Sequence, residues 1–338
     1  MRHPYRIREI AAQAGLSEAT VDRVLHGRGG VRESTIREVH QAIADLDRQQ
    51  SQVRLGGRTF MIDVVVQAPP RFSGAVRAAL EASLPELRPA VLRSRFHLLD
   101  GPSVGEVVAV LERIGRGRSH GVILKAPDVP EIVAAARELD VPLVTLVTDV
   151  PAAPRVTYVG LDNRAAGATA AYLIQQWLAD RAGDVLVVRG HGSFRGEDER
   201  EAGFRAEMRH RRLFEVVDAE DRADAVRAGI RSVLAANPSV RAIYSLYAGA
   251  GGNAAVVAAF AEQRRPYDVF VAHDLDPENT ALLRERKLSA VLHHDLRTDL
   301  RRACHAIMQA QGALPGPIRT NPSAVQVITP HNAPPVVF

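Results

Sequence analysis

The chain has 338 residues, too many for one ordinary small domain, and 46% of them are apolar, as in globular proteins. It contains no run of 18 apolar residues, its first residues precede no apolar core, and Cys304 is the only cysteine. These features exclude a membrane span and a disulfide framework and predict a cytoplasmic protein without a secretion signal. Residues 1–58 hold ten arginines against seven acids, so most of the net charge of +4 lies where contact with nucleic-acid phosphates would need it.

Two short helices joined by a tight turn are predicted near the N-terminus. Ile7, Ile10 and Ala11 recur at helical spacing. Gly15 can adopt the left-handed conformation that ends a helix, and Ser17 is a suitable N-cap for the next one. The pattern is therefore typical of a helix-turn-helix.

The second of these helices has one apolar side and one exposed side. Val21, Val24 and Leu25 form the apolar side, whereas short polar side chains of the kind that enter a major groove lie at its N-terminal face. A basic, glycine-rich turn follows at 27–30. The predicted DNA-contacting residues of this region are Ser17, Glu18, Ala19, Thr20, Arg23, His26 and Arg28.

A third helix is predicted over residues 31–46, where Ile36, Val39 and Ile43 belong to one apolar stripe. Three helices at this spacing form a self-contained domain over residues 1–46. A generic helical hairpin is the alternative, because helix-turn-helix spacing by itself is a weak signal.

From about residue 60 the chain alternates apolar runs with amphipathic helical stretches. This alternation predicts parallel sheets covered by helices, and residues 60–338 suffice for two such lobes. The expected strands lie at 60–66, 121–124, 143–147, 184–188, 242–246, 269–272 and 290–292. The expected helices include 73–87, 129–139 and 164–177.

In open α/β sheets ligands bind beyond the carboxyl ends of the strands, so the residues after each run are candidates for a binding site. They supply an aromatic ring, carboxylates, a guanidinium, an amide and an imidazole, which suit the hydroxyl and C–H groups of a sugar. The candidate effector-binding residues are Phe72, Asp149, Arg200, Asn253, Asp274 and His294. No catalytic residue, metal site or cofactor is expected, and the glycine-containing loops at 190–196 and 249–252 lack Gly-Lys-Ser/Thr.

The motif Ile-Ala-x-x-Ala-Gly-Leu-Ser-x-x-Thr-Val-x-Arg-Val-Leu-x-Gly, followed by Val-Arg-x-x-Thr, closely resembles the DNA-binding domain of the lactose/galactose-repressor (LacI/GalR) family. Residues 60–330 resemble the periplasmic-binding-protein-like sensor domain of that family, most strongly over 157–173, where its chain crosses between lobes. The resemblance implies an N-terminal all-α helix-turn-helix domain and a two-lobed α/β domain with parallel sheets. The first lobe is expected at about 60–162 and 294–320, and the second at about 163–293 and 321–330.

The resemblance also implies roles for individual residues. In the family an arginine ahead of Gly-Phe, an asparagine after a glycine turn and an aspartate after a strand grip the effector. These positions match Arg200, Asn253 and Asp274, while Asp149 and Phe72 lie where the first lobe contributes.

The chain departs from the family pattern in two places. His294 stands where the family usually carries glutamine, which suggests a different or pH-sensitive effector. The polar segment 47–59 is expected to be a linker, yet it lacks the Tyr-x-Pro-Asn of the family's hinge helix. Leu55, or more weakly Val53, is then the candidate for a minor-groove wedge, unless it packs on the sensor as an ordinary linker residue.

Several of these residues have plainer alternatives. Phe72 could belong to the core. Lys125 is expected at a solvent-exposed strand end, and a cation between the lobes is its alternative. The acids and the amide that could serve only as turn residues or helix caps are Asp128, Asp149, Asp162 and Asn163.

The leading functional interpretation is a transcription regulator, most simply a repressor, that binds an operator in double-stranded DNA as a homodimer. A small sugar-like effector (sugar, polyol or derivative) between the lobes would control its operator affinity, with no membrane partner. A sugar-binding transport component and a sugar-modifying enzyme are the alternatives, but the attached DNA reader argues against the first and the lack of a nucleophile motif against the second.

Overall fold

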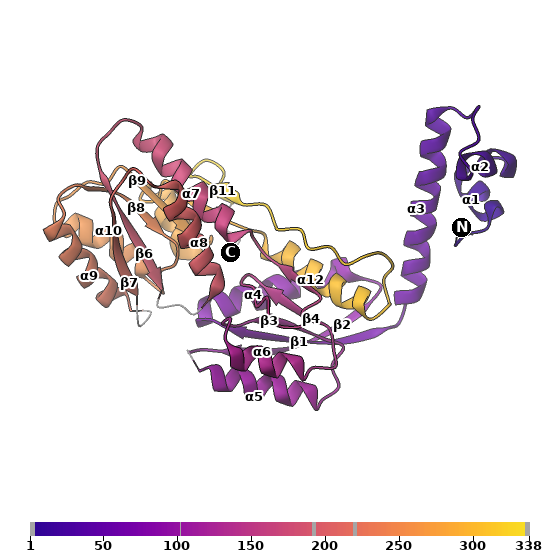
Figure 1. Cartoon of the computed structure of the whole chain (residues 1–338), viewed down its shortest axis with the longest axis horizontal. Coiled ribbons are helices and arrows are strands. Elements are labelled where there is room, and N and C mark those ends of the chain that lie inside the picture. Colours follow the sequence, from indigo (N-terminus) through magenta and orange to yellow (C-terminus); the bar gives the residue numbers. More distant parts are fainter. Residues whose placement is uncertain (1–3, 102, 191–193, 219–221, 335–338) are drawn as a thin grey trace.

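The computed structural model describes residues 4–101, 103–190, 194–218 and 222–334. The ends of the predicted domains at 1–3 and 335–338, and residues 191–193 of the first glycine-containing loop, lie outside the described residues. Figure 1 shows a small helical body at one end of the molecule, joined by a single long helix to two α/β lobes.

The small helical body, called the reader below, is the predicted three-helix unit. It consists of α1 (Ile7–Ala14), α2 (Glu18–Leu25) and the first part of α3 (Glu33–Leu55). Gly15 ends α1 in the left-handed conformation with φ 67°, and the Ser17 hydroxyl caps α2 by accepting the Thr20 N–H at 3.2 Å. The apolar stripes of the three helices meet in a core that contains Ile10, Val21 and Val39.

The third helix is longer than the sequence pattern indicated. Residues 47–55, which were expected to begin a linker, continue α3 without a break, and the helix ends only before Gly56-Gly57. The physical reason is that 47–55 contains no glycine or proline and is rich in residues with good helix propensity. The expected linker therefore shrinks to the three residues between α3 and the first strand.

The first lobe is built on a five-stranded parallel sheet with strand order β2-β1-β3-β4-β5. Helices α4 and α12 pack on one face of this sheet and α5 and α6 on the other (Figure 1). The elements are β1 (Thr59–Gln67), α4 (Pro70–Ser83), the short helix η1 (Leu84–Leu87), β2 (Val91–Leu99), α5 (Val104–Gly115), β3 (Gly121–Lys125), α6 (Pro130–Arg137), β4 (Leu143–Leu146), β5 (Thr157–Val159) and α12 (Leu296–Ala310).

The second lobe is built on a six-stranded sheet with order β11-β10-β9-β8-β6-β7, in which only the β10–β11 pair is antiparallel. Helices α7 and α8 cover one face, and α9, α10 and α11 cover the other. The elements are α7 (Asn163–Leu178), β6 (Asp184–Gly190), α8 (Arg195–Glu207), β7 (Leu213–Asp218), α9 (Ala223–Ala236), β8 (Val240–Ser245), α10 (Gly252–Glu262), β9 (Val269–His273), α11 (Pro277–Arg284), β10 (Ala290–His293) and β11 (Gln326–Ile328).

The predicted fold class is confirmed, and all seven expected strands are present. The sequence pattern missed β2, β5, β7 and β11. Strand β2 is an edge strand in which charged residues such as Arg93 and Arg95 alternate with apolar ones, so it offers no apolar run to recognise. Over the described part of the chain, no helix is long and apolar enough to cross a membrane.

The chain passes between the lobes three times, and the passages lie close together. The first passage leads from β5 into α7, the second from β10 into α12, and the third from α12 back to β11. The Ser323 N–H donates to the Gly160 carbonyl at 2.8 Å, and a bridge pairs Leu161 with Ser323. These contacts make the passages a joint hinge between the carboxyl ends of the two sheets.

Candidate functional site

The exposed face of α2 carries the residues predicted to read DNA. Glu18, Ala19 and Arg23 are exposed, whereas Thr20 is half-buried and bonds the Ser17 hydroxyl at 2.8 Å. Ser17 and Thr20 therefore hold the start of the helix, and the three exposed side chains are free to meet base edges or phosphates.

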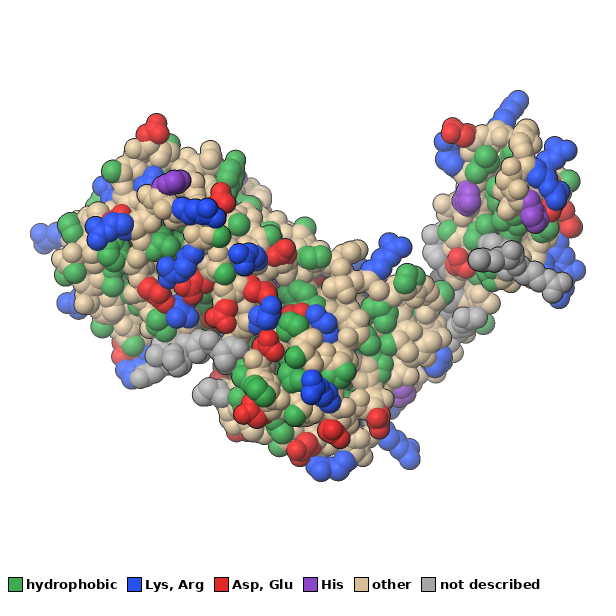
Figure 2. Space-filling view, viewed as in Figure 1, with side chains coloured by type: hydrophobic (Ala, Val, Ile, Leu, Met, Phe, Trp, Pro, Cys, Tyr) green, Lys and Arg blue, Asp and Glu red, His purple; other side chains and the backbone are tan. Residues whose placement is uncertain are grey.

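The basic turn after α2 is tied to the helix by one carboxylate. Asp22 pairs with Arg28 at 2.8 Å and with His26 at 3.0 Å. Both partners are exposed, so these contacts add little stability, but they orient two side chains on the α2 side of the reader. Basic side chains are spread over the reader surface in Figure 2.

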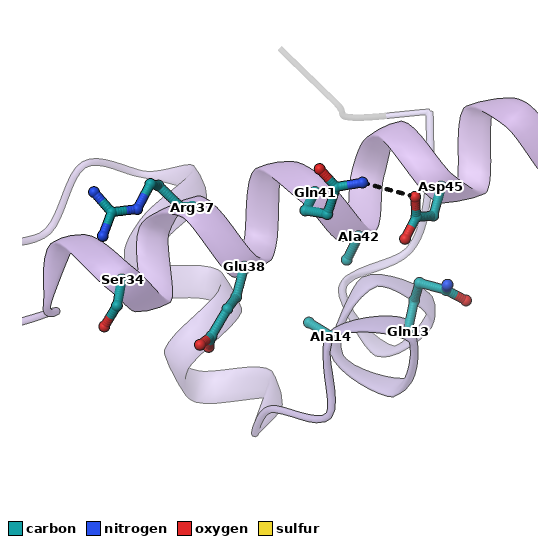
Figure 3. A pocket seen from close by; sticks show the side chains of 8 residues that line it. All are labelled: Gln13, Ala14, Ser34, Arg37, Glu38, Gln41, Ala42 and Asp45. Carbon is teal, nitrogen blue, oxygen red and sulfur yellow. Dashed lines mark hydrogen bonds between the residues drawn. The ribbon is translucent and has the colours of Figure 1, made fainter.

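A hollow in the reader lies away from this face. It has a volume of about 470 Å³ and lies between the end of α1 and the first part of α3 (Figure 3). Its polar lining includes Gln41, which donates to Asp45 at 2.9 Å, and its lining residues all come from α1 and α3. The hollow is thus separate from the predicted DNA-contacting residues.

Leu55 is not placed as a DNA-contacting residue. Its side chain is only 5% exposed and packs in the first-lobe core with Phe60 and Leu87, because the end of α3 docks on that lobe. Val53, by contrast, is 80% exposed. In this conformation the minor-groove role predicted for Leu55 is replaced by its alternative, packing on the sensor.

Arg200, on α8 of the second lobe, is 5% exposed and lies at the junction of the lobes. Its Nε donates to Asn163 Oδ1 at 2.8 Å, and its Nη1 donates to the Leu246 carbonyl at 3.3 Å. Arg200 is brought close to α7 because the two helices cross at glycines: a Cβ on Gly167 would lie 1.9 Å from the Arg200 carbonyl oxygen.

Asn253, at the start of α10, presents a buried amide oxygen. Asn279 donates through Nδ2 to the carbonyls of His273 and Asp274, so its own Oδ1 must accept from Asn253 Nδ2, at 2.8 Å. That chain of bonds fixes the orientation of the Asn253 amide. Its Oδ1 has no hydrogen-bond partner among the described residues, although the residue is only 5% exposed.

Asp274 follows β9 in the left-handed conformation with φ 63°, which aspartate tolerates better than most residues. Burial raises the pKa of its carboxyl, but neighbouring positive charge, that of Arg200 first, outweighs burial and lowers the pKa overall. The carboxylate is therefore ionised among cationic and imidazole groups from three elements.

His294 is almost fully buried, with 1% of its surface exposed, and is oriented by Asp299. Its Nδ1 lies 2.6 Å from Asp299 Oδ2, and the other Asp299 oxygen accepts a hydrogen bond from Ser323. The residue thus lies at the second and third passages of the hinge, electrostatically coupled to Asp274.

Lys125, at the end of β3 in the first lobe, reaches the second lobe. Its Nζ lies 3.7 Å from the ring centre of Phe194 in the second lobe and 5.4 Å from that of Phe72, and it donates to the Gln67 carbonyl at 3.0 Å. Burial lowers the pKa of Lys125 to about 8, although Glu197 and other acids act in the opposite direction. The interpretation of this lysine as a cation between the lobes is thus the one that its surroundings favour, and Phe72 lies beside it.

Asp149 is engaged within the first lobe. Its carboxylate binds Arg155 through Nε at 2.5 Å and Nη2 at 2.6 Å, and also accepts from Thr145 and the Val150 N–H. Oδ1 accepts three of these bonds and Oδ2 accepts one, so the carboxylate is held mainly by its own lobe. The effector contact expected of Asp149 stays a prediction. Sequence spacing gave no sign that Arg155 would fold back onto it.

Ion pairs join the two lobes on either side of this region. Arg71 binds Asp276 and lies 4.0 Å from Glu278, and Arg195 lies 3.4 Å from Asp128. Figure 2 shows charged side chains of both signs gathered where the lobes meet. Asp128, considered only as a turn residue or a weak candidate, is thus a lobe-to-lobe contact.

Sequence reasoning missed some polar groups of the second lobe. His273 Nδ1 and Ser245 Oγ are buried without a hydrogen-bond partner in the described part of the chain. His273 also lies 2.9 Å from the Tyr244 hydroxyl through Nε2, and burial lowers its pKa well below the ordinary value, so it is neutral. Ser245 is the last residue of β8 and His273 the last residue of β9. Their position at strand ends is a sequence signal by which both could have been included among the candidates. Within the described residues no group of three side chains suited to metal binding occurs.

Two family models match the chain. The model for bacterial regulatory proteins of the lacI family matches residues 6–48, and the model for the periplasmic binding protein domain matches residues 93–312. The chain belongs to the lacI family of bacterial regulatory proteins. It is accordingly a DNA-binding transcriptional regulator with a two-lobed ligand-binding domain.

Solved structures with the fold of this regulator's two lobes include GanP, a glucose-galactose binding protein from Geobacillus stearothermophilus (19% identity, 82% of this chain and 99% of the other, TM-score 0.72). A protein described as a LacI transcriptional regulator from Bacteroides fragilis has 16% identity, 81% and 98% coverage and a TM-score of 0.69. A carbohydrate transporter from Acidothermus cellulolyticus, in complex with myo-inositol, has 15% identity, 81% and 96% coverage and a TM-score of 0.70. No curated protein matches the sequence.

Proposed function

We propose that this regulator acts as a homodimeric repressor whose operator affinity is controlled by a sugar or polyol bound between its lobes. The observation that carries the proposal is the buried, unpartnered Asn253 oxygen, whose amide is joined through Asn279 to Asp274, in the same chain as a lacI-type reader. A buried polar atom without a partner costs about 1–3 kcal/mol, and a bound ligand that satisfies it recovers that cost.

The fixed amide orientation favours a ligand with hydroxyl groups. Asn253 Oδ1 and the Asp274 carboxylate only accept hydrogen bonds, so the ligand has to donate to them. Arg200 donates in the opposite direction, and a hydroxyl group can both donate and accept. A fully deprotonated anion such as sulfate offers acceptors only, and therefore suits this set less well than a sugar or polyol does.

Two of the similar structures support the same ligand class. GanP is a glucose-galactose binding protein and the Acidothermus protein holds myo-inositol. The proposal extends that chemistry to this chain, where Lys125 and the ring of Phe72 would contact the ligand from the first lobe.

On the DNA side, the proposal assigns base reading to Glu18, Ala19 and Arg23 on α2 and backbone contacts to His26 and Arg28. One small reader covers too few base pairs for useful specificity, so a homodimer on a near-palindromic operator is part of the proposal.

The test is calorimetry on the full chain with D-glucose, D-galactose, D-arabinose and myo-inositol, beside D-glucose 6-phosphate. We expect one neutral compound to bind and Asp274→Asn to weaken it about tenfold or more, since a charged hydrogen bond is lost. Asparagine tolerates the left-handed conformation, so the backbone is kept. Binding of the phosphate alone, or unchanged affinity in Asp274→Asn, would contradict the proposed site.

A further inference from the structure

One buried amide joins the two lobes at the first passage of the hinge. Asn163, the first residue of α7, is 2% exposed. Its Oδ1 accepts from Arg200 Nε at 2.8 Å, and its Nδ2 donates to the Val147 carbonyl at 3.1 Å and to the Tyr158 hydroxyl at 3.2 Å. The amide thus bonds one residue of the second lobe and two of the first.

The direction of this amide is fixed by its partners. Arg200 only donates and the Val147 carbonyl only accepts. A flipped amide would place its N–H groups against the Arg200 guanidinium and its oxygen against the Val147 carbonyl oxygen, and both contacts would be repulsive. Burial raises the pKa of Tyr158, so its hydroxyl stays protonated and donates to the Leu161 carbonyl at 2.8 Å. Asn163 can therefore keep its contacts to Val147 and Tyr158 only while both lobes hold their present positions.

The first-lobe side of this contact is strained. Val147 has φ 65°, a conformation that β-branched residues rarely adopt and that costs about 1–3 kcal/mol. Its N–H donates to Val159 at 2.9 Å, and its carbonyl lies 3.0 Å from the Tyr158 hydroxyl as well as near Asn163. The strained conformation directs this carbonyl to the hinge.

The neighbouring residue adds a second link at the same place. The Gly196 N–H, at the start of α8, donates to Thr148 Oγ1 at 3.0 Å. A Cβ on Gly196 would lie 2.9 Å from Asn163 Nδ2, so the backbone of α8 approaches the amide directly. The helix that carries Arg200 is thus held against the end of β4 by two adjacent contacts.

We propose that Asn163 is a positioning residue that couples the guanidinium of Arg200 to the main chain of the first lobe at Val147, so that the arrangement of the lobes depends on Arg200. This inference goes beyond the proposed function, because it concerns the ligand-free chain and holds whichever small molecule the regulator binds. Asn163 was considered from sequence only as part of a helix cap. The cap is Asp162, whose Oδ1 accepts the Ala165 N–H at 2.9 Å.

A ligand that engages the remaining donors of Arg200 fixes the same guanidinium that Asn163 holds. A ligand shifts a conformational equilibrium only through its different affinity for the two states. The bonds from the Asn163 amide to Val147 and Tyr158 supply such a difference, because they cross between the lobes and exist only when the lobes are arranged as they are here. The bond from Arg200 to Asn163 lies within the second lobe and sets the direction of that amide.

The test is a distance measurement between spin labels on the two lobes of the full chain, with labelled chain diluted in unlabelled chain. Glu112→Cys on α5 and Ala228→Cys on α9 provide exposed positions, and the native Cys304 is fully buried. The variants are Asn163→Asp, which keeps the acceptor for Arg200 and loses both donations, Asn163→Ala, and Arg200→Ala. Thr169→Ala is the matched control, since it removes a side-chain bond to Ala165 from the same helix.

We expect a narrow distance distribution in the parent chain and in Thr169→Ala, and a broader or shifted one in the three hinge variants. Adding Arg200→Ala to Asn163→Ala should then change the distribution no further, because both substitutions interrupt the same connection between Arg200 and Val147. A parent-like distribution in either Asn163 variant, even with a lowered melting temperature, would show a merely structural role and overturn the proposal. So would a parent-like distribution in Arg200→Ala. If Asn163→Ala does not fold, Asn163→Asp decides.

Discussion

The two lobes share one architecture but treat an aspartate after a sheet strand in opposite ways. In the first lobe, Asp149 follows β4 and is bound by Arg155, six residues further along the same chain segment. In the second lobe, Asp274 follows β9, and its main cationic neighbour, Arg200, comes from a separate helix. The Asp149 carboxylate is bound by a residue close to it in sequence and stabilises its own lobe. The charge of Asp274 is compensated mainly by a residue of another element, so we propose that this carboxylate can still bind a ligand.

Buried side-chain atoms without a partner occur in both lobes among the described residues. Asn253 Oδ1 and His273 Nδ1 belong to the second lobe, and Gln67 Oε1, at the end of β1, belongs to the first. The first lobe contributes Lys125 and the strained carbonyl of Val147. In the proposed function the second lobe supplies most of the ligand contacts, through Arg200, Asn253 and Asp274, and the first lobe supplies Lys125 and Phe72. Four variants test this division, beginning with the largest expected effect.

Leu55→Ala should destabilise the first lobe by about 2–5 kcal/mol, because the side chain is buried in its core at the end of α3. Chemical denaturation of the full chain, followed by hydrogen exchange in the first lobe, measures this. Val53→Ala, on the exposed side of the same turn, is the matched control and should be nearly neutral. A weakened operator affinity with parental stability would instead restore Leu55 as a minor-groove residue.

Asp149→Ala should cost about 1–3 kcal/mol of stability, since it leaves the half-buried Arg155 guanidinium without its main partner. Ligand affinity per folded molecule should change little, in contrast to Asp274→Asn. Denaturation and calorimetry on the same preparations separate the two quantities. Parental stability combined with lost ligand binding in Asp149→Ala would remove the distinction between the lobes.

Lys125→Met should make stability less dependent on pH in the alkaline range. Burial lowers the pKa of Lys125 in the folded chain from 10.5 to about 8, so between these values the unfolded chain binds more protons. The parent chain should therefore gain stability relative to Lys125→Met as the pH rises from about 8 to 10.5. Denaturation of both proteins across this range gives the difference, and a constant difference would place the ammonium in a water-like environment.

Arg71→Ala should have the smallest effect, at most about 1 kcal/mol of stability, because the Arg71 side chain is 35% exposed in its pairs with Asp276 and Glu278. Its influence should appear as a wider range of lobe positions in solution scattering. Arg37→Ala in the reader, which removes an exposed pair with Glu33, is a control that should leave the lobes unchanged. Equal scattering from Arg71→Ala and the parent would show that this pair does not join the lobes.

Much of this organisation could be predicted from sequence because it rests on local patterns. The helix-turn-helix, the alternation of strands with helices and the positions of Arg200 and Asp274 follow from spacing and from residues at strand ends. The extension of α3 to Leu55 could also have been predicted, because residues 47–55 contain no helix breaker. It was missed because a linker was expected at 47–59.

The rest depends on partners that are distant in sequence. The environment of Lys125 is made by Phe194 and Glu197 of the other lobe, and Asn163 acquires its role only where Arg200 and Val147 meet. Periodicity and spacing report which face a residue occupies, and these contacts arise between faces of separate elements. Such contacts need the folded chain.

The most direct test of the account is the affinity of the full chain for an operator selected from random-sequence DNA, with and without the neutral compound that calorimetry identifies. We predict that the compound changes operator affinity at least about fivefold in the parent chain, as coupling energies between sites usually do. Asp274→Asn should bind the operator like the parent and no longer respond to the same concentration of compound. Operator affinity unchanged by a compound that demonstrably binds between the lobes, or a full response in Asp274→Asn, would contradict the account.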